Sequence, residues 1–146
     1  MPFTAVDPDY VARVRDSFSR QRVMQTLGAE ITRIEPGEVE IVLPFRADLT
    51  QQHGFLHAGV VITVLDSALG YAAYSLMPPG HAVLSVEIKT NLLAPAKGDR
   101  LLAVGRVVRA GRTLTVCLGE GWMERTDGRE QVALMTATMI GLPDRE

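Results

Sequence analysis

The sequence predicts an α+β fold in which an antiparallel sheet of about five to six strands curls around one long central helix. Two observations predict it. Residues 58–77 contain a single charged residue, Asp66, and a helix that is apolar on nearly every side is normally enclosed by other elements. Around this segment, apolar and polar residues alternate between turn signals, which is typical of half-buried strands. The length of 146 residues suits one domain.

The individual elements follow from the same patterns in chain order. Residues 8–27 carry apolar residues at helical spacing among charged ones, and Gly28 ends this amphipathic helix. The central helix over residues 58–77 ends at a Pro-Pro-Gly run. Strands are predicted over residues 29–35, 38–44, 82–92, 100–109, 112–124 and 131–141. Such a sheet has edge strands, which favours pairing with another copy of the chain.

Composition excludes several classes of function. The formal net charge is −2 and the pI is about 5.9. We therefore expect no nucleic-acid partner, because phosphate neutralisation supplies most of that affinity. A single cysteine, Cys117, excludes an intrachain disulfide and a multi-cysteine zinc site, and its apolar strand predicts a core residue rather than a nucleophile. The three histidines lack a carboxylate at ligand spacing, so we predict no metal and no cofactor.

The apolar segment over residues 58–77 is long enough for a membrane span, but other features contradict that interpretation. Asp66 lies near its middle, and flanking Lys and Arg residues are absent. We therefore predict no membrane span. The first residues also lack a basic and then apolar signal peptide, which predicts a cytoplasmic protein.

Asp66 is the first candidate for a catalytic residue. An ionised carboxylate in an apolar helix loses its hydration, so it must be neutral, paired or facing a cavity that holds water. Acids of this kind concentrate in functional sites. The alternative is a structural carboxylate, hydrogen-bonded to a neighbouring strand or to Ser or Thr hydroxyls.

The start of the central helix is the second candidate. Small residues at a helix N-terminus leave backbone N–H groups open to an incoming oxygen, such as a thioester carbonyl that develops negative charge. A plain entry from loop to helix is the alternative. His57 precedes Asp66 by nine positions, which corresponds to about 13 Å of helical rise and places the two side chains on opposite sides. Two copies in a symmetric dimer can bring them together, so we expect a homodimer with shared sites.

One residue and four short segments together resemble a known family: Asp66, and residues 57–59, 85–89, 93–98 and 111–114. In this order they resemble the hotdog-fold acyl-CoA thioesterases of the PaaI type, over roughly residues 28–141. The resemblance implies a hotdog domain over residues 28–146, preceded by a helical extension over residues 1–27. It also implies a homodimer that pairs into a homotetramer, and hydrolysis of an acyl-CoA substrate to a free acid and CoA.

The same resemblance implies a role for each candidate residue. Gln51 would position the attacking water or the thioester, His57 would help to orient the site, and the N–H of Ala58 would polarise the thioester carbonyl. Asp66 of the partner subunit would act as general base or as nucleophile, assisted by a hydrogen bond from Ser85. Ala58 stands where the family has glycine, and Gln51 stands where asparagine is common.

Substrate contacts are expected along the central helix and at a hairpin. Gly59 and Val60 would bind substrate at the helix start, and Arg109 and Arg112 would hold a CoA phosphate unless they are merely solvated hairpin charges. The acyl group is expected near Val60, Val61, Val64 and Leu65. On the strand over residues 82–92, regular alternation places Ser85, Glu87 and Lys89 on one face.

A non-catalytic acyl-CoA-binding or lipid-binding module is the competing function. In that case Asp66 is a buried structural acid. The fold does not decide between the two functions, because one scaffold hosts both hydrolases and binding proteins.

Overall fold

The computed structural model describes residues 2–145. Its helices are α1 (Tyr10–Ser19), α2 (Arg22–Leu27), the 3₁₀ helix η1 (Ala47–Leu49) and α3 (Ala58–Tyr74). Its strands are β1 (Glu30–Glu35), β2 (Glu38–Pro44), β3 (Ala82–Leu92), β4 (Arg100–Ala110), β5 (Leu114–Arg125) and β6 (Gly128–Leu142). The strands form one antiparallel sheet in the order β1-β2-β4-β5-β6-β3.

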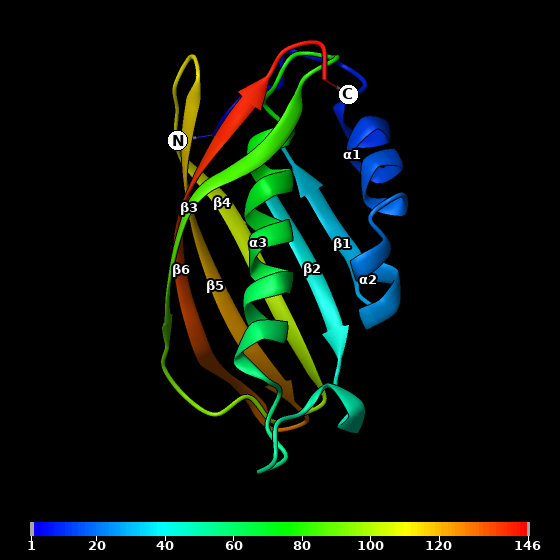
Figure 1. Cartoon of the computed structure of the whole chain (residues 1–146), viewed down its shortest axis with the longest axis vertical. Helices are drawn as coiled ribbons and strands as arrows, with labels where there is room; N and C mark the ends of the chain where they lie inside the picture. The colour runs from blue at the N-terminus through cyan, green and yellow to red at the C-terminus, as the bar shows by residue number, and fades with distance from the viewer. Residues whose placement is uncertain (1, 146) are drawn as a thin grey trace.

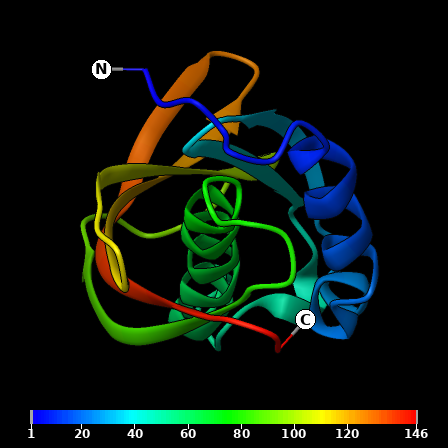
Figure 2. The ribbon, with the colours of Figure 1, turned by 90° about the horizontal axis from the view of Figure 1, so that it is seen from above.

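The sheet curls around α3, which confirms the predicted α+β arrangement. Figure 1 shows α3 lying along the concave face, and the view down the helix in Figure 2 shows the strands around it, with α1 and α2 at one side. The core consists mainly of α3 side chains and the inward-facing residues of the strands. Val64, Leu65, Ala68 and Leu69 are completely buried. This burial explains why the helix sequence is apolar on nearly every side.

Close contact between α3 and the sheet depends on Gly105 of β4. A Cβ atom built at this position would lie 2.5 Å from the carbonyl carbon and oxygen of Ala68 in α3. Any side chain there would push the helix away from the strand, because the neighbouring atoms belong to backbone and cannot rotate aside. The glycine therefore sets the depth at which α3 lies in the sheet.

The N-terminal region differs from the single helix predicted over residues 8–27. The chain leaves α1 through a turn in which the N–H groups of Arg20 and Gln21 donate to the carbonyls of Ser17 and Phe18, each at 3.1 Å. Gln21 then adopts an extended backbone conformation before α2 begins. The break redirects the second half of the segment, so that Met24 of α2 as well as Val14 of α1 is completely buried.

The strand predictions are confirmed, with shifts of up to three residues at their ends; the largest is that β6 begins at Gly128 instead of residue 131. The helix α3 ends at Tyr74, three residues before the predicted boundary, and a turn connects it to the proline pair. No helix within residues 2–145 is long and apolar enough to cross a membrane.

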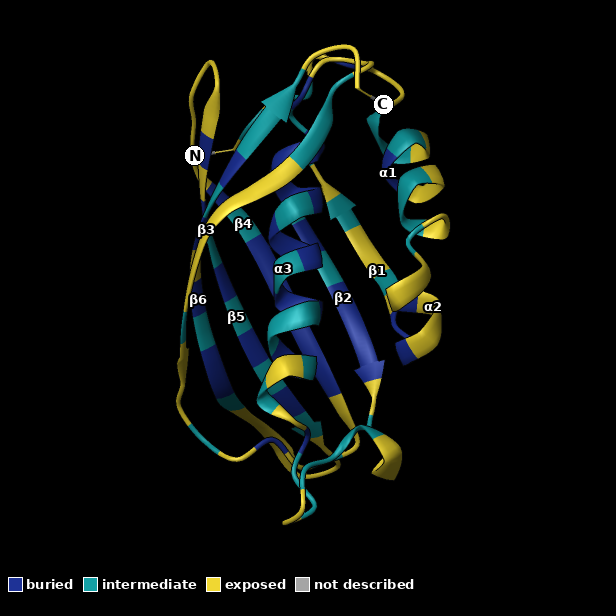
Figure 3. Ribbon diagram, viewed as in Figure 1, coloured by how far each residue is buried: buried dark blue, intermediate teal, exposed yellow. Residues whose placement is uncertain are grey.

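The two edges of the sheet differ in their surroundings. At one edge, β1 lies beside α1, whereas β3 forms the other edge and is exposed over most of its length, as the yellow ribbon in Figure 3 shows. Large apolar side chains are exposed along this edge: Leu84, Val86, Ile88 and Leu92. Figure 3 also shows that one side of α3 remains uncovered between β1 and β3. Asp66 is half-buried on α3 and lines a pocket together with Ser85 of β3.

Candidate active site

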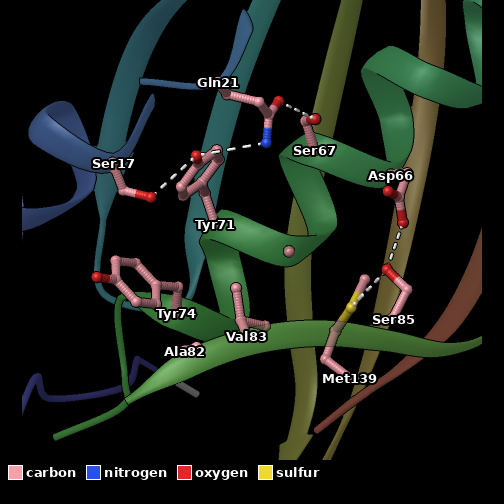
Figure 4. A pocket seen from close by; sticks show the side chains of 11 residues that line it. Ser17, Gln21, Asp66, Ser67, Tyr71, Tyr74, Ala82, Val83, Ser85 and Met139 are labelled. Atoms are coloured by element: carbon pink, nitrogen blue, oxygen red, sulfur yellow. Dashed lines mark hydrogen bonds between the residues drawn. The ribbon is translucent and has the colours of Figure 1, made fainter. Parts of the chain in front are cut away.

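Asp66 lies half-buried on α3 and lines a pocket of about 190 Å³ between this helix, α1 and β3 (Figure 4). The hydroxyl of Ser85 donates a hydrogen bond of 2.6 Å to Asp66 Oδ1. Among residues 2–145, no donor contacts Asp66 Oδ2. One carboxylate oxygen therefore has a hydrogen-bond partner and the other is available to a ligand. This agrees with the expectation that a carboxylate in an apolar helix is paired or faces a cavity.

A β-bulge places Ser85 where it reaches Asp66. The pairing of β3 with β6 shifts between Ser85, which faces Met139, and Glu87, which faces Thr138. The extra residue, Val86, turns Ser85 inward and Glu87 outward. The prediction that Ser85, Glu87 and Lys89 share one face of the strand is therefore wrong, because regular alternation does not hold across a bulge.

The start of α3 lines a second pocket, of about 650 Å³. Gln51, His57 and Ala58 belong to it. The loop that carries Gln51 is closed by two backbone hydrogen bonds, from the Gln51 N–H to the Phe55 carbonyl and from the Gly54 N–H to the Gln51 carbonyl. The Gln51 Oε1 atom accepts from the N–H groups of His53 at 2.6 Å and Phe55 at 3.3 Å. Its amide is therefore oriented with the oxygen toward the loop, and within residues 2–145 its Nε2 hydrogens have no acceptor.

His57 caps α3. Its Nδ1 accepts from the N–H of Gly59 at 2.9 Å, so a neutral His57 carries its proton on Nε2. A Cβ atom on Gly59 would lie 3.1 Å from this nitrogen, so the glycine leaves room for the ring. The cap uses the N–H of Gly59, whereas the N–H of Ala58 donates to no atom of residues 2–145. One amide at the positive end of α3 is therefore open to a ligand.

The two groups of candidates do not meet within one chain. Asp66 and Ser85 line one pocket, whereas Gln51, His57 and Ala58 line the other. This separation agrees with the spacing on the helix, since Ala58 and Asp66 are about 12 Å apart along its axis. A small reacting group can contact both sets only if a second chain supplies one of them.

The remaining expected substrate contacts are more distant. Of the residues expected near the acyl group, Val64 and Leu65 are completely buried in the core, whereas Val61 lines the pocket at the helix start. Val60 packs against the core and lines neither of these two pockets. Arg109 and Arg112 are exposed at the hairpin between β4 and β5, and Arg112 lines a hollow beside the C-terminal end of α3.

Comparison with known proteins assigns the family. The family model described as the thioesterase superfamily matches residues 53–128, which is more than half of the chain. The chain belongs to the thioesterase superfamily. The matched range includes Asp66, Ser85 and the start of α3, so membership identifies the protein as a thioester hydrolase.

Related proteins agree with this assignment. The solved structure of a thioesterase family protein from Silicibacter pomeroyi is 54% identical, has a TM-score of 0.90, and covers 92% of this chain and 98% of that one. The E. coli PaaI protein, from the phenylacetic acid degradation operon, shares the fold at a TM-score of 0.82 and 21% identity, covering 92% of this chain and 94% of that one. A 1,4-dihydroxy-2-naphthoyl-CoA hydrolase from Listeria monocytogenes is 27% identical over 64% of this chain and 76% of that protein. The predicted hotdog fold and enzyme class are confirmed.

Sequence reasoning missed the polar residues that line the rest of the Asp66 pocket in this thioesterase. Ser17 and Gln21 come from the N-terminal segment and contact Ser67 and Tyr71 of α3 (Figure 4). These contacts join residues that are 46 to 54 positions apart in the sequence, so no local sequence pattern predicts them. The available signal was Ser67, directly after Asp66, and Tyr71, five residues after Asp66, in a mainly apolar helix.

Cys117 is not part of either pocket. It lies completely buried on β5, and burial raises the pKa of its thiol from 9.0 to about 12. A thiol in this environment stays protonated at neutral pH and is inert as a nucleophile. Within residues 2–145, no three His, Cys, Asp or Glu side chains lie close enough to hold a metal ion.

Proposed function

We propose that this thioesterase hydrolyses an acyl-CoA thioester to a free carboxylic acid and CoA, in a homodimer whose two active sites lie between the subunits. One observation carries this proposal: a single chain holds an available carboxylate and an available pair of N–H donors in two different pockets. The CoA thiol is supported by the Listeria monocytogenes relative, whose name describes hydrolysis of a CoA ester.

The helix-start pocket supplies the positive half of the site. The N–H of Ala58 and the Nε2 amide of Gln51 both border this pocket, at the positive end of the α3 dipole. Donors that are fixed before the reaction stabilise the negative charge that develops on the thioester oxygen. Gln51 is fixed because two backbone N–H groups hold its side-chain oxygen. Ala58 is fixed because it belongs to the helix.

Asp66 supplies the negative half of the site. Ser85 holds Oδ1, which leaves Oδ2 either to attack the thioester carbon or to remove a proton from the attacking water. In both cases the carbon–sulfur bond breaks, the CoA sulfur is protonated and one water is consumed. Single-turnover hydrolysis in ¹⁸O-labelled water, with enzyme in excess, tests for direct attack. Label in the Asp66 carboxyl group indicates an anhydride that water opens at the Asp66 carbon. General-base catalysis, like an anhydride that water opens at the acyl carbon, puts the label only into the product acid, so trapping of an acyl-aspartyl intermediate decides between these two cases.

The exposed β3 edge supports the dimer. A long edge strand with exposed apolar side chains, here Val86, Ile88 and Leu92, favours pairing with a second copy. If two copies pair antiparallel at this edge, their α3 helices run in opposite directions, and Asp66 of one subunit faces the helix start of the other. The same arrangement brings Arg112, near the C-terminal end of one α3, toward the helix start of the other chain, where it would bind a CoA phosphate.

We further propose that two dimers pair into a tetramer through the outer face of the sheet. That face carries a second apolar cluster, formed by Val42, Leu102 and Val104 with Trp122 packed against them. Sedimentation velocity of the wild-type protein measures its oligomeric state directly. A charged substitution, Val104→Glu, should reduce a tetramer to dimers without loss of the sites between paired β3 edges.

Replacement of Asp66 by asparagine tests catalysis. Wild type, Asp66→Asn and the matched control Asp127→Asn, which alters an exposed turn carboxylate, are assayed for CoA release on a panel of acyl-CoA esters. We expect the rate constant to fall at least about a hundredfold in Asp66→Asn alone, with folding and assembly unchanged. If wild type and Asp66→Asn bind the esters but release equally little CoA across the panel, the protein is a binding module and the proposed reaction is wrong.

A further inference from the structure

The pocket beside Asp66 extends away from the carboxylate toward the N-terminal segment. Figure 4 shows Asp66 and Ser85 at one end and Ser17 at the other, with Gln21 between them, bonded to Ser67 and Tyr71 of α3. Along α3 the pocket is lined from Asp66 to Tyr74. The distance from Asp66 to Tyr71 along the helix axis is about 7.5 Å. A group whose carbonyl carbon lies at Asp66 and which extends along α3 would therefore reach Tyr71 and the Gln21 amide that donates to the Tyr71 hydroxyl.

Gln21 belongs to a hydrogen-bonded chain that fixes its side chain. The hydroxyl of Ser67 donates to Gln21 Oε1 at 2.7 Å, and Gln21 Nε2 donates to the Tyr71 hydroxyl at 3.4 Å. The hydroxyls of Tyr71 and Ser17 lie 3.1 Å apart in a further hydrogen bond. A carboxamide nitrogen carries two hydrogens. The second hydrogen on Gln21 has no acceptor among residues 2–145, so it can donate to a ligand oxygen.

The N-terminal helix holds this polar wall in place through Arg13. Its guanidinium forms an ion pair of 2.8 Å with Asp7 and donates to the carbonyls of Met77 and Pro78 beyond the end of α3. It also lies 4.6 Å from the centre of the Tyr74 ring. Ser17 is one helical turn after Arg13 on α1, so the same anchor positions it at the pocket.

The size and lining of the pocket restrict what can bind there. Its volume of about 190 Å³ is smaller than the roughly 300–1,000 Å³ of ordinary ligand pockets and close to the roughly 150 Å³ of a cavity that holds benzene. Val83, Tyr74 and Met139 provide apolar walls for a ring, whereas the far end is polar. A long alkyl chain would exceed the volume and would bury methyl groups against the Gln21 amide, whose hydrogen would then lack a partner.

We propose that Gln21 determines acyl specificity: it selects a compact, ring-sized acyl group that carries an oxygen substituent at the end remote from the thioester. The Gln21 amide donates to that oxygen, and α1 closes the pocket to long aliphatic chains. This role rests on the acyl-CoA hydrolysis proposed above. It specifies the class of acyl group that the enzyme hydrolyses, and it assigns a function to the N-terminal segment.

A matched pair of substrates tests this role. The ratio of kcat/KM for 4-hydroxybenzoyl-CoA to that for benzoyl-CoA is measured together with kcat/KM for decanoyl-CoA. Wild type should favour the hydroxylated ring over both other esters. Gln21→Met keeps the length of the side chain but removes the amide, and we expect it to lower the ratio about five- to tenfold while benzoyl-CoA is still hydrolysed. The matched control is Gln25→Met, on α2, whose side chain donates to the Ser19 carbonyl outside the pocket and should leave the ratio unchanged.

Ser67→Ala provides a second variant that preserves the Gln21 side chain and removes the hydrogen bond that orients it. We expect a smaller decrease of the same ratio. An unchanged ratio in both folded variants, or a wild type that prefers decanoyl-CoA, would overturn the role of Gln21 and leave acyl-CoA hydrolysis intact. If wild type hydrolyses none of the three esters, nor any other ester of the acyl-CoA panel, the proposed function itself fails, and the role of Gln21 fails with it.

Discussion

Removal of the Ser85 hydroxyl is expected to slow catalysis without unfolding the protein. Ser85 donates to Asp66 Oδ1 at 2.6 Å, and a hydrogen bond to a charged group contributes about 1.5–3 kcal/mol. Because Asp66 is half-buried and water can replace part of this interaction, we take the lower end of that range. In Ser85→Ala, kcat should therefore fall about tenfold, which corresponds to about 1.4 kcal/mol.

The effect should appear in kcat rather than in KM, because Ser85 contacts the carboxylate and its loss leaves the two N–H donors of the other pocket in place. The same hydrogen bond contributes to the folded state, but Ser85 is exposed on an edge strand and water replaces part of the bond, so the free energy of unfolding should fall by no more than about 1.5 kcal/mol. Steady-state kinetics on the best acyl-CoA ester and urea denaturation at fixed protein concentration measure the two quantities.

Two further variants complete this test. Ser85→Thr retains a hydroxyl on a strand and should restore most of kcat. Thr138→Ala removes a hydroxyl that faces Glu87 on the outer side of the same strand pair, and it should have no effect. If kcat of Ser85→Ala equals that of wild type, or if kcat falls equally in Ser85→Ala and Thr138→Ala, the hydrogen bond to Asp66 does not serve catalysis.

Two other predictions concern packing and pH. Gly105→Ala should lower the free energy of unfolding by about 1–3 kcal/mol, because its Cβ would meet the Ala68 backbone, whereas the control Gly70→Ala, with open space at its Cβ, should be neutral or stabilising in the same urea titration. A Gly105→Ala protein as stable as wild type would contradict the packing of α3. Burial raises the pKa of Cys117 to about 12, so iodoacetamide at pH 8 should label it only in urea. Since the folded-state pKa lies above the reference value of 9.0, this thiol should make the free energy of unfolding decline between pH 9 and pH 12, and rapid labelling of the native protein would refute its burial.

The sequence was sufficient to predict the elements whose pattern is local. Apolar and polar residues alternate along the strands because one face is buried, and the α3 segment is apolar on nearly every side because most of its faces are buried. Asp66 was recognisable for the same reason, because one charge in such a helix requires an explanation. The separation of the two candidate groups was also predictable, since helical geometry alone separates His57 from Asp66.

Features that depend on contacts between distant residues could not be predicted. The bulge at Val86 follows from how β3 pairs with β6, and it alone turns Ser85 toward Asp66. The break before α2 is marked by no proline or glycine, and it results from the packing of both halves against the core. The contact between Gln21 and Ser67 exists only because the N-terminal segment folds back over α3. Gln21 itself has no distinctive sequence neighbourhood.

Subunit complementation tests most directly whether each active site combines Asp66 of one chain with the helix start of the other. Asp66→Asn and Gln51→Ala, each with little activity alone, are mixed in equal amounts under conditions of confirmed subunit exchange. Random pairing makes half of the dimers hybrids with one intact site each, so CoA release should recover to about a quarter of the wild-type rate. If the exchanged mixture is no more active than the separate variants, each site is built within a single chain and the proposed arrangement is wrong.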